Sequence, residues 1–404
     1  MIPNQPRFLY IGMVCTQAYG KGIGQSTFIG AASGKMCSVV SALRLAGRRA
    51  VLVSLPFVKD EVIYQPGNVC RGDGFPALFL PTWRSAVIRK LLGAFLLAWF
   101  AIRRVRQQDI ILFYNHATEY ILALLVFKLR GIAVFQDIED IPNSADRGLR
   151  GSLNRLGYLI MFKLASPRKV TVSNQIGNSL DLREFLAIQG IATETVSSCD
   201  TEKWMQLMAG APLRVHFGGT LMPTTGLDLF CAALLHLDAI AGSIGRKIEF
   251  IVTGVGDLRP VHNFNENTML QSGWLSVEVH EGITRDVYFG LFGSCHASLS
   301  LRSPEAEISS TTFPSKVIEI TSGGLALVST QVSDIDHIFS DDSAWLLPEF
   351  SAPCLSSALL EMAQNPVEVR RRAEAGKVLV RTRFAPLAVG RRLAEFLDAG
   401  PILR

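Results

Sequence analysis

Residues Ser303–Gly324, SPEAEISSTTFPSKVIEITSGG, predict a polar loop that leads into a helix beginning at Pro314. The N–H groups at the start of a helix have no partner within it, and together with the positive end of the helix dipole they favour a phosphate group. Lys316 adds a full positive charge near that end, and Glu319, three residues later, projects from the same face. A cation for a diphosphate beside a carboxylate for ribose hydroxyls is what a sugar-nucleotide pocket needs.

The same residues also have an ordinary explanation. Thr312 and Pro314 are typical of a helix start, and Lys316 with Glu319 would then form a solvated ion pair. The segments that precede this loop favour the first interpretation.

Those segments alternate between apolar runs and helical patterns. Two of the apolar runs lead into glycine turns, one at Gly218 and Gly219 and one at Gly254 and Gly256. This alternation predicts an α/β fold with a doubly wound parallel sheet, whose ligands bind at the carboxyl ends of the strands. The predicted strands are 214–220, 247–253, 277–282, 296–301 and 325–330, and the predicted helices are 226–235, 285–292 and 314–324.

With this order of motifs, the C-terminal half resembles the retaining, nucleotide-sugar-dependent glycosyltransferases of the GT-B fold, in the group 1 or family 4-like class with a Glu-x7-Glu motif. The shared pattern is a Gly-rich turn followed by Gly226-Leu-Asp-Leu229, a Gly-x-Gly turn, and a Phe313-Pro-Ser-Lys-x-x-Glu319 helix that ends in glycine. The resemblance implies two Rossmann-like domains facing a cleft, a nucleotide-sugar donor, and no metal or other cofactor for the leaving group.

The resemblance also implies which residues bind the donor. The second glutamate of the family motif binds the ribose and corresponds to Glu319, whereas the first corresponds to Thr311, which is not acidic. Glu305 or Glu307 is the candidate for the first position if the loop differs in length. The predicted donor-binding residues are Gly22, Gly24, Gly218, Gly219, Gly254, Gly256, Glu307, Thr312, Ser315, Lys316 and Glu319.

One departure from the family concerns the diphosphate. The family places an Arg and a Lys after the first glycine turn, where this chain has Thr220 and Thr225. Loss of such donors weakens the stabilisation of transition-state charge by several kcal/mol, and Lys316 and Arg302 are the candidates to replace them. Two alternatives stay open: a catalytically silent GT-B scaffold or partner subunit, and a GT-B sugar-nucleotide epimerase.

The N-terminal half predicts a second domain of the same kind. A strand over 7–14 is followed by a flexible glycine loop over 19–24, a helix over 28–46 and a strand over 49–55. The spacing of Gly20, Gly22 and Gly24 differs from G-x-G-x-x-G, so no dinucleotide site is expected. In GT-B enzymes this loop lies near the acceptor and the transferred sugar, which is the basis for Gly22 and Gly24. A plain strand-to-helix turn is the alternative.

Two further predicted strands, 109–114 and 132–136, lead into polar residues. The resemblance places a histidine or an acidic residue of this region near the sugar, so the catalytic candidates are His116, Glu139 and Asp140. As alternatives, His116 is a structural hydrogen-bonding residue, and Asp137 or Asp140 caps the next segment.

A basic-flanked apolar run lies between Asp73 and Asp109, a stretch without any acidic residue. The run, 91–102, is shorter than the about 20 residues that a membrane span needs. A helix of this kind predicts attachment to an anionic membrane surface, which would suit a lipid-linked acceptor. A core helix with solvated ends is the alternative. The flanking cations are Arg84, Arg89, Lys90, Arg103, Arg104 and Arg106.

Length and composition agree with two α/β domains in 404 residues. The predicted domains are an acceptor-side domain over 1–200, a nucleotide-sugar-binding domain over 201–384, and a C-terminal helix over 385–404 that crosses back to the first domain. The seven cysteines are scattered without a C-x-x-C pair, which indicates reduced thiols in a cytoplasm and no structural zinc. The net charge of +5 is mild and no basic tract is interleaved with aromatics, so nucleic acid is not an expected partner.

The start of the chain lacks a charged region followed by an apolar signal core, so export is not expected. The sequence therefore predicts a cytoplasmic glycosyltransferase that is peripheral at the inner face of the cell membrane if the apolar run 91–102 faces the lipid. It would transfer a sugar with retention from a nucleotide-sugar to a glycan or lipid-linked acceptor in cell-surface polysaccharide synthesis.

Overall fold

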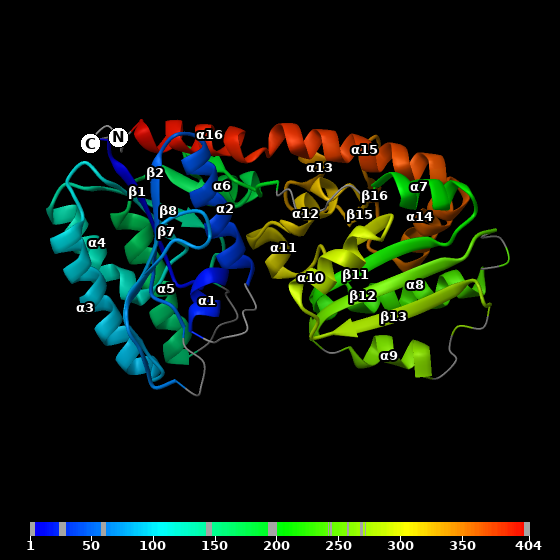
Figure 1. Cartoon of the computed structure of the whole chain (residues 1–404), viewed down its shortest axis with the longest axis horizontal. Helices are drawn as coiled ribbons and strands as arrows, with labels where there is room; N and C mark the ends of the chain where they lie inside the picture. Colours follow the sequence, from blue (N-terminus) through cyan, green and yellow to red (C-terminus); the bar gives the residue numbers. More distant parts are fainter. Residues whose placement is uncertain are drawn as a thin grey trace. The chain divides into compact units, whose positions relative to one another are not determined.

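The computed structural model describes residues 5–23, 30–57, 62–142, 148–192, 200–240, 242, 245–256, 258–266, 270 and 272–399. The chain divides into two compact units. Unit 1 comprises Met1–Ile191 together with Ala385–Arg404, and unit 2 comprises Ala192–Phe384. Each unit is built on a parallel sheet covered by helices (Figure 1).

Unit 1 contains an eight-stranded sheet with the order β10-β9-β8-β7-β1-β2-β5-β4, in which only the pair β4 and β5 is antiparallel among the described residues. Strands β3 and β6 form a separate antiparallel pair. The strands are β1 (Arg7–Gly12), β2 (Arg49–Ser54), β3 (Tyr64–Gln65), β4 (Asn68–Cys70), β5 (Ala77–Phe79), β6 (Thr82–Trp83), β7 (Ile110–Tyr114), β8 (Ala133–Ile138), β9 (Lys169–Thr171) and β10 (Phe185–Ala187). The helices are α1 (Gln17–Gly22), α2 (Ala31–Leu45), α3 (Ala86–Arg104), η1 (Thr118–Tyr120), α4 (Ile121–Leu129), α5 (Gly148–Leu164), α6 (Asn174–Ser179) and α16 (Pro386–Asp398).

Each face of this sheet has its own apolar core, because alternate residues of a strand point to opposite sides. Tyr10 packs with residues of α2 and α16, whereas the neighbouring Leu9 packs with residues of α3 and α4. The contact between α16 and α2 is close at Gly390, where a Cβ would lie 2.0 Å from the carbonyl oxygen of Ala42. The C-terminal helix is therefore an integral layer of unit 1.

Unit 2 contains a six-stranded sheet with the order β13-β12-β11-β14-β15-β16, and its described pairs are all parallel. Its strands are β11 (Leu213–Leu221), β12 (Ile248–Gly256), β13 (Leu275–Glu281), β14 (Ala297–Ser300), β15 (Ala326–Thr330) and β16 (Trp345–Leu347). Its helices are α7 (Asp200–Met208), η2 (Pro223–Thr225), α8 (Leu227–Ala239), α9 (Arg259–Glu266), α10 (Arg285–Gly293), α11 (Glu307–Thr311), α12 (Lys316–Ser322), α13 (Ile335–Ile338), α14 (Ala352–Gln364) and α15 (Pro366–Arg383). The predicted α/β class and parallel sheets are confirmed.

The glycine loop predicted over residues 19–24 is wrong for its described part. Residues Gln17–Gly22 form helix α1, because the Thr16 hydroxyl caps it by accepting the Tyr19 N–H at 3.3 Å. The buried Tyr19 ring also stacks on Phe79 at 3.8 Å between centroids. These contacts outweigh the cost of glycine in a helix, about 1 kcal/mol each. Gly24 lies outside the described residues.

Two predicted boundaries also shift. Asp137 was expected to follow its strand, but it is the fifth residue of β8 and pairs with Tyr114 of β7. The helix predicted to begin at Pro314 begins at Lys316 instead. Strand β8 extends two residues beyond the predicted end because Tyr10 and Lys35 hold the Asp137 side chain in place.

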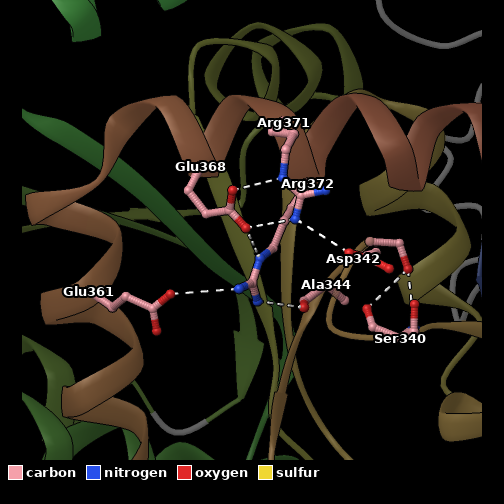
Figure 2. Close-up of polar contacts among 8 residues, drawn as sticks. Ser340, Asp342, Ala344, Glu361, Glu368, Arg371 and Arg372 are labelled. Atoms are coloured by element: carbon pink, nitrogen blue, oxygen red, sulfur yellow. Dashed lines mark hydrogen bonds and ion pairs between the residues drawn. The ribbon is translucent and has the colours of Figure 1, made fainter.

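Helix α15 is held to unit 2 by a network centred on Arg372 (Figure 2). The Arg372 guanidinium donates to Glu368 at 2.7 Å and to the carbonyl oxygen of Ala344 at 3.1 Å. It also lies over the Trp345 ring, 4.1 Å from its centroid. Hydrogen bonds from Arg371 and Arg372 lower the pKa of Glu368 to about 2. A lowered carboxylate pKa stabilises the fold above its ordinary titration range, and that contribution is lost as the pH falls towards 2.

Replacing Arg372 by alanine is expected to lower the free energy of unfolding by about 1.5–3 kcal/mol, because Glu368 loses a charged partner and Trp345 its stacked cation. Urea denaturation followed by circular dichroism measures this. The matched control is Arg370→Ala, which removes an exposed pair with Glu374 and should cost less than about 0.5 kcal/mol. Equal losses in the two variants would show that Arg372 has no special role.

Candidate functional site

Strands β11 and β12 approach each other closely at their carboxyl ends. Gly219 pairs with Gly254, and Leu221 pairs with Gly256. A Cβ on Gly254 would lie 2.1 Å from the carbonyl oxygen of Gly219, and a Cβ on Gly256 would lie 2.2 Å from that of Leu221. Their φ angles of +150° and +131° are also ones that L side chains rarely adopt. The approach of the two strands therefore requires these glycines, and leaves bare backbone at the strand ends.

The side chain of Lys316 reaches this backbone from the start of α12. Its Nζ donates a hydrogen bond to the carbonyl oxygen of Gly218 and lies 3.8 Å from where a Cβ on Gly219 would be. Burial lowers the pKa of Lys316 to about 8, and the Glu319 carboxylate partly opposes this shift. The structure thus brings together three of the predicted donor-binding residues. A bound anion would stabilise the charged amine that burial disfavours.

Glu319 lies one turn further along the same helix. Its Oε1 accepts a hydrogen bond from the Tyr288 hydroxyl of α10 at 3.2 Å, and its second carboxylate oxygen makes no hydrogen bond with the described residues. Burial, followed by the charge of Glu319, raises the pKa of Tyr288, so this hydroxyl remains a donor. One oxygen of Glu319 is therefore oriented and the other remains available as an acceptor.

A buried histidine packs behind this site, and the sequence analysis did not identify it. His216 of β11 is fully buried and hydrogen-bonds with Ser298 Oγ at 2.9 Å and Thr253 Oγ1 at 2.8 Å. Burial and the charge of Lys316 hold the pKa of His216 well below its usual range, so the ring is neutral. The sequence did contain a signal for this residue, because His216 lies between the apolar residues Val215 and Phe217 of a predicted strand.

Three further predicted donor residues of unit 2, Glu307, Thr312 and Ser315, lie between β14 and α12. The Thr312 hydroxyl accepts from Arg302 Nη1 at 2.5 Å. Ser315 directly precedes α12 and is exposed, and Glu307 is exposed at the first residue of α11. The structure brings neither Ser315 nor Glu307 into a described hydrogen bond with Lys316.

Thr220 and Thr225, the residues expected to be cations from the resemblance, lie in one local turn. Thr225 Oγ1 accepts the Met222 N–H at 3.0 Å and lies 2.7 Å from the carbonyl oxygen of Thr220, to which it donates. These hydrogen bonds hold together the turn from Thr220 to Thr225. Thr220 itself is exposed.

Unit 1 has a polar cluster at the carboxyl end of β8. Lys35, on α2, forms an ion pair with Asp137 at 3.3 Å and another with Glu139. The buried Tyr10 hydroxyl also donates to Asp137. Burial lowers the pKa of Lys35, while Asp137 and Asp140 act against that shift. Lys35 and Tyr10 were missed from the sequence, because neither follows a predicted strand end.

The other two catalytic candidates are connected through Asn115. This residue follows β7 with a left-handed φ of 55° and donates from Nδ2 to Asp140 Oδ2 at 3.2 Å. His116 lies 3.1 Å from Asn154 Oδ1 through its Nε2, and burial lowers its pKa. Asp140 and His116 therefore both contact the Asn115 side chain, whereas Glu139 belongs to the separate group around Lys35. Gly22 is the last residue of α1.

Within the described residues, no three or more His, Cys, Asp or Glu side chains are grouped so that they could hold a metal ion. None of the described helices is both long enough and apolar enough to cross a bilayer.

No protein-family model and no curated protein matches this sequence. Solved structures do match. They include HepE of Anabaena in complex with UDP and glucose (TM-score 0.65, 12% identity, 98% of this chain and 100% of that chain). A glycosyltransferase from Rickettsia africae matches with TM-score 0.64 and 14% identity over 98% of each chain. Sucrose-phosphate synthase from Thermosynechococcus elongatus matches with TM-score 0.66 and 12% identity over 98% of this chain and 99% of that chain.

At such low identity these similarities establish the fold alone. The chain has the GT-B fold, with Rossmann-like parallel sheets in both units.

Proposed function

We propose that this protein is a glycosyltransferase that moves a sugar from a nucleotide-sugar donor to an acceptor with retention of configuration. The observation that carries the proposal is the Lys316 amine at the backbone of Gly218 and Gly219, with Glu319 one turn away. The similarity to structures described with UDP and UDP-glucose supports it.

In the proposed complex the diphosphate lies against Lys316 and the backbone of the glycine turn, and the free oxygen of Glu319 accepts a ribose hydroxyl. The bond between the anomeric carbon and the diphosphate breaks, the acceptor hydroxyl oxygen forms the new bond to that carbon, and the hydroxyl proton passes to the leaving diphosphate. Lys316 stabilises the negative charge that develops on the leaving group, the task for which the family uses cations. We propose that this occurs without a metal or other cofactor.

In unit 1, we assign the acceptor or transferred sugar to Asp140, Glu139 and His116, which follow β7 and β8. Glu139 is paired with Lys35, whereas Asp140 is exposed and is oriented by Asn115. Asp140 is therefore the best candidate for binding a sugar hydroxyl. A neutral His116 can either donate or accept a hydrogen bond there.

Thr220 and Thr225 keep one alternative open, a scaffold that binds a nucleotide-sugar without turning it over. Release of nucleoside diphosphate from UDP-, GDP- and ADP-sugars, measured with and without an acceptor fraction, distinguishes these cases. Binding without release would indicate the scaffold, and conversion of the donor to an isomeric sugar nucleotide would indicate an epimerase.

Glu319→Ala is expected to weaken binding of the preferred nucleotide-sugar by about 10- to 100-fold, because a charged acceptor contributes about 1.5–3 kcal/mol. Isothermal titration calorimetry measures this. The matched control, Tyr288→Phe, removes the hydroxyl that orients Glu319 but keeps the carboxylate, and should have a smaller effect. Wild-type affinity in Glu319→Ala would remove this residue from the site.

Donor affinity is expected to fall as the pH rises through about 8. The lowered pKa of Lys316 means that the free protein loses this charge above pH 8, so affinity is level below that value. Above it, affinity falls by up to about tenfold per pH unit. Lys316→Arg, whose charge persists, should remove the dependence. A wild-type titration that is flat from pH 7 to about pH 10 would contradict a phosphate contact of Lys316.

We further propose that the acceptor is lipid-linked and that unit 1 docks on the inner face of the membrane, as in synthesis of cell-surface polysaccharide. Helix α3 has two apolar faces: Leu97 and Phe100 are buried in the core, while a stripe at intervals of three and four residues is exposed. The stripe comprises Val87, Leu91, Phe95, Trp99 and Ile102. The neighbouring α4 and α5 expose further leucines, namely Leu125, Leu129, Leu153, Leu156 and Leu159.

Charge favours an anionic bilayer as the partner of this face. The exposed side chains of Arg103, Arg104 and Arg106 lie at its end, and the segment has no acidic residue from 74 to 108. An exposed apolar stripe beside cations is the composition of helices that lie in the membrane interface.

Replacing Arg103, Arg104 and Arg106 by glutamine is expected to lower the binding constant for anionic vesicles about 100-fold, at about 1 kcal/mol per charge. Co-sedimentation measures it, and Trp99 fluorescence reports insertion. The control replaces Arg370, Arg381 and Arg391, which removes the same charge elsewhere. Absence of binding by the wild type, or equal loss in the control, would contradict docking through α3.

A further inference from the structure

A cavity of about 570 Å³ is lined by four arginines at the amino-terminal edge of the unit 1 sheet. Arg7 and Arg49 are the first residues of β1 and β2 and are direct partners in the parallel register. Arg44 comes from the last turn of α2, and Arg71 from the loop between β4 and β5. The other lining residues carry no charge: Gln5, Val51, Gly74, Phe75 and Pro76.

The positive charge of this cavity is only partly balanced. Arg7 forms an ion pair with Asp109 at 2.5 Å. Arg44 makes a long hydrogen bond of 3.4 Å to the carbonyl oxygen of Ala50. Arg44, Arg49 and Arg71 make no ion pair with any described residue.

The nearest acidic residue in sequence to Arg71 is Asp73, which does not line the cavity. Its Oδ1 accepts the Ala18 N–H at 3.1 Å. Arg44, Arg49 and Arg71 therefore line one cavity without an ion-paired carboxylate among the described residues, and this excess of positive charge favours a bound anion.

We propose that this four-arginine cavity binds a phosphate group. Guanidinium groups bind phosphate through paired N–H donors, and the cavity has room for a diphosphate or a lipid headgroup. Arg7 Nη2 also donates to the carbonyl oxygen of Arg104, the last residue of α3, at 2.7 Å. The cavity is thereby joined to the basic end of the helix that carries the exposed apolar stripe.

This site is separate from the proposed donor site, which lies in unit 2 around Lys316. It also lies at the end of the unit 1 sheet away from Asp140, because β1 and β7 run parallel and their carboxyl ends meet at the opposite edge. The inference therefore stands whether or not the protein transfers a sugar.

Two probes test it: inorganic diphosphate in calorimetry, and vesicles of phosphatidylcholine doped with phosphatidic acid in co-sedimentation. Both use the full chain carrying Lys316→Ala, so that the proposed donor site does not contribute. The variant Arg49→Gln with Arg71→Gln is compared with Arg183→Gln with Arg391→Gln, which removes the same charge from exposed positions of unit 1. If the first double variant does not fold, Arg71→Gln alone, a change in an exposed loop residue, takes its place.

At least tenfold weaker diphosphate binding in the cavity variant, with the control unchanged, supports a soluble phosphate ligand. The same loss seen only with vesicles supports a lipid headgroup. Equal effects of the cavity and control variants, or no binding of either probe by the protein with intact arginines, would overturn the proposal.

Discussion

The close parallel approach of β11 and β12 at their carboxyl ends determines the geometry of the site in unit 2. A side chain at Gly254 or Gly256 would collide with the backbone of the neighbouring strand. Because both positions are glycine, β11 continues to Leu221 and presents its carbonyl at Gly218 to the Lys316 amine. The cation, the bare backbone and Glu319 share one place as a result of this packing constraint.

Each unit has a partly buried lysine near its strand ends, and the charges around the two lysines differ. Lys35 is paired with Asp137 and Glu139, so unit 1 supplies its own counter-charges. Lys316 bonds a neutral carbonyl, and its pKa falls to about 8. A largely desolvated cation without a direct ion pair costs stability in the free protein and is stabilised when an anion binds. This difference makes unit 2 the better candidate for binding the negatively charged part of a substrate.

Helix α3 shows why a sequence pattern could not separate two explanations. The run 91–102 fits both a core helix and a membrane-facing helix, because a helix that is apolar on all sides has no pattern to show which face is buried. In the fold one face packs under the sheet through Leu97 and Phe100, while Phe95 and Trp99 on the other side remain exposed. The core explanation thus holds for half of the helix, and the exposed half carries the docking proposal.

Local pattern was sufficient for the α/β class, the strand order along the chain and the presence of Lys316 and Glu319 on one helix, because these depend on residues close in sequence. The tertiary structure decided which side chains contact each other. His216 lies behind the site through Thr253 and Ser298, which are far apart in the sequence. Lys35 meets Asp137 across more than a hundred residues. The segment predicted as a glycine loop forms helix α1, because the Tyr19 ring stacks on the buried Phe79. The sequence alone therefore determined the α/β class and the helix that carries Lys316 and Glu319, and packing determined the surroundings of each charge.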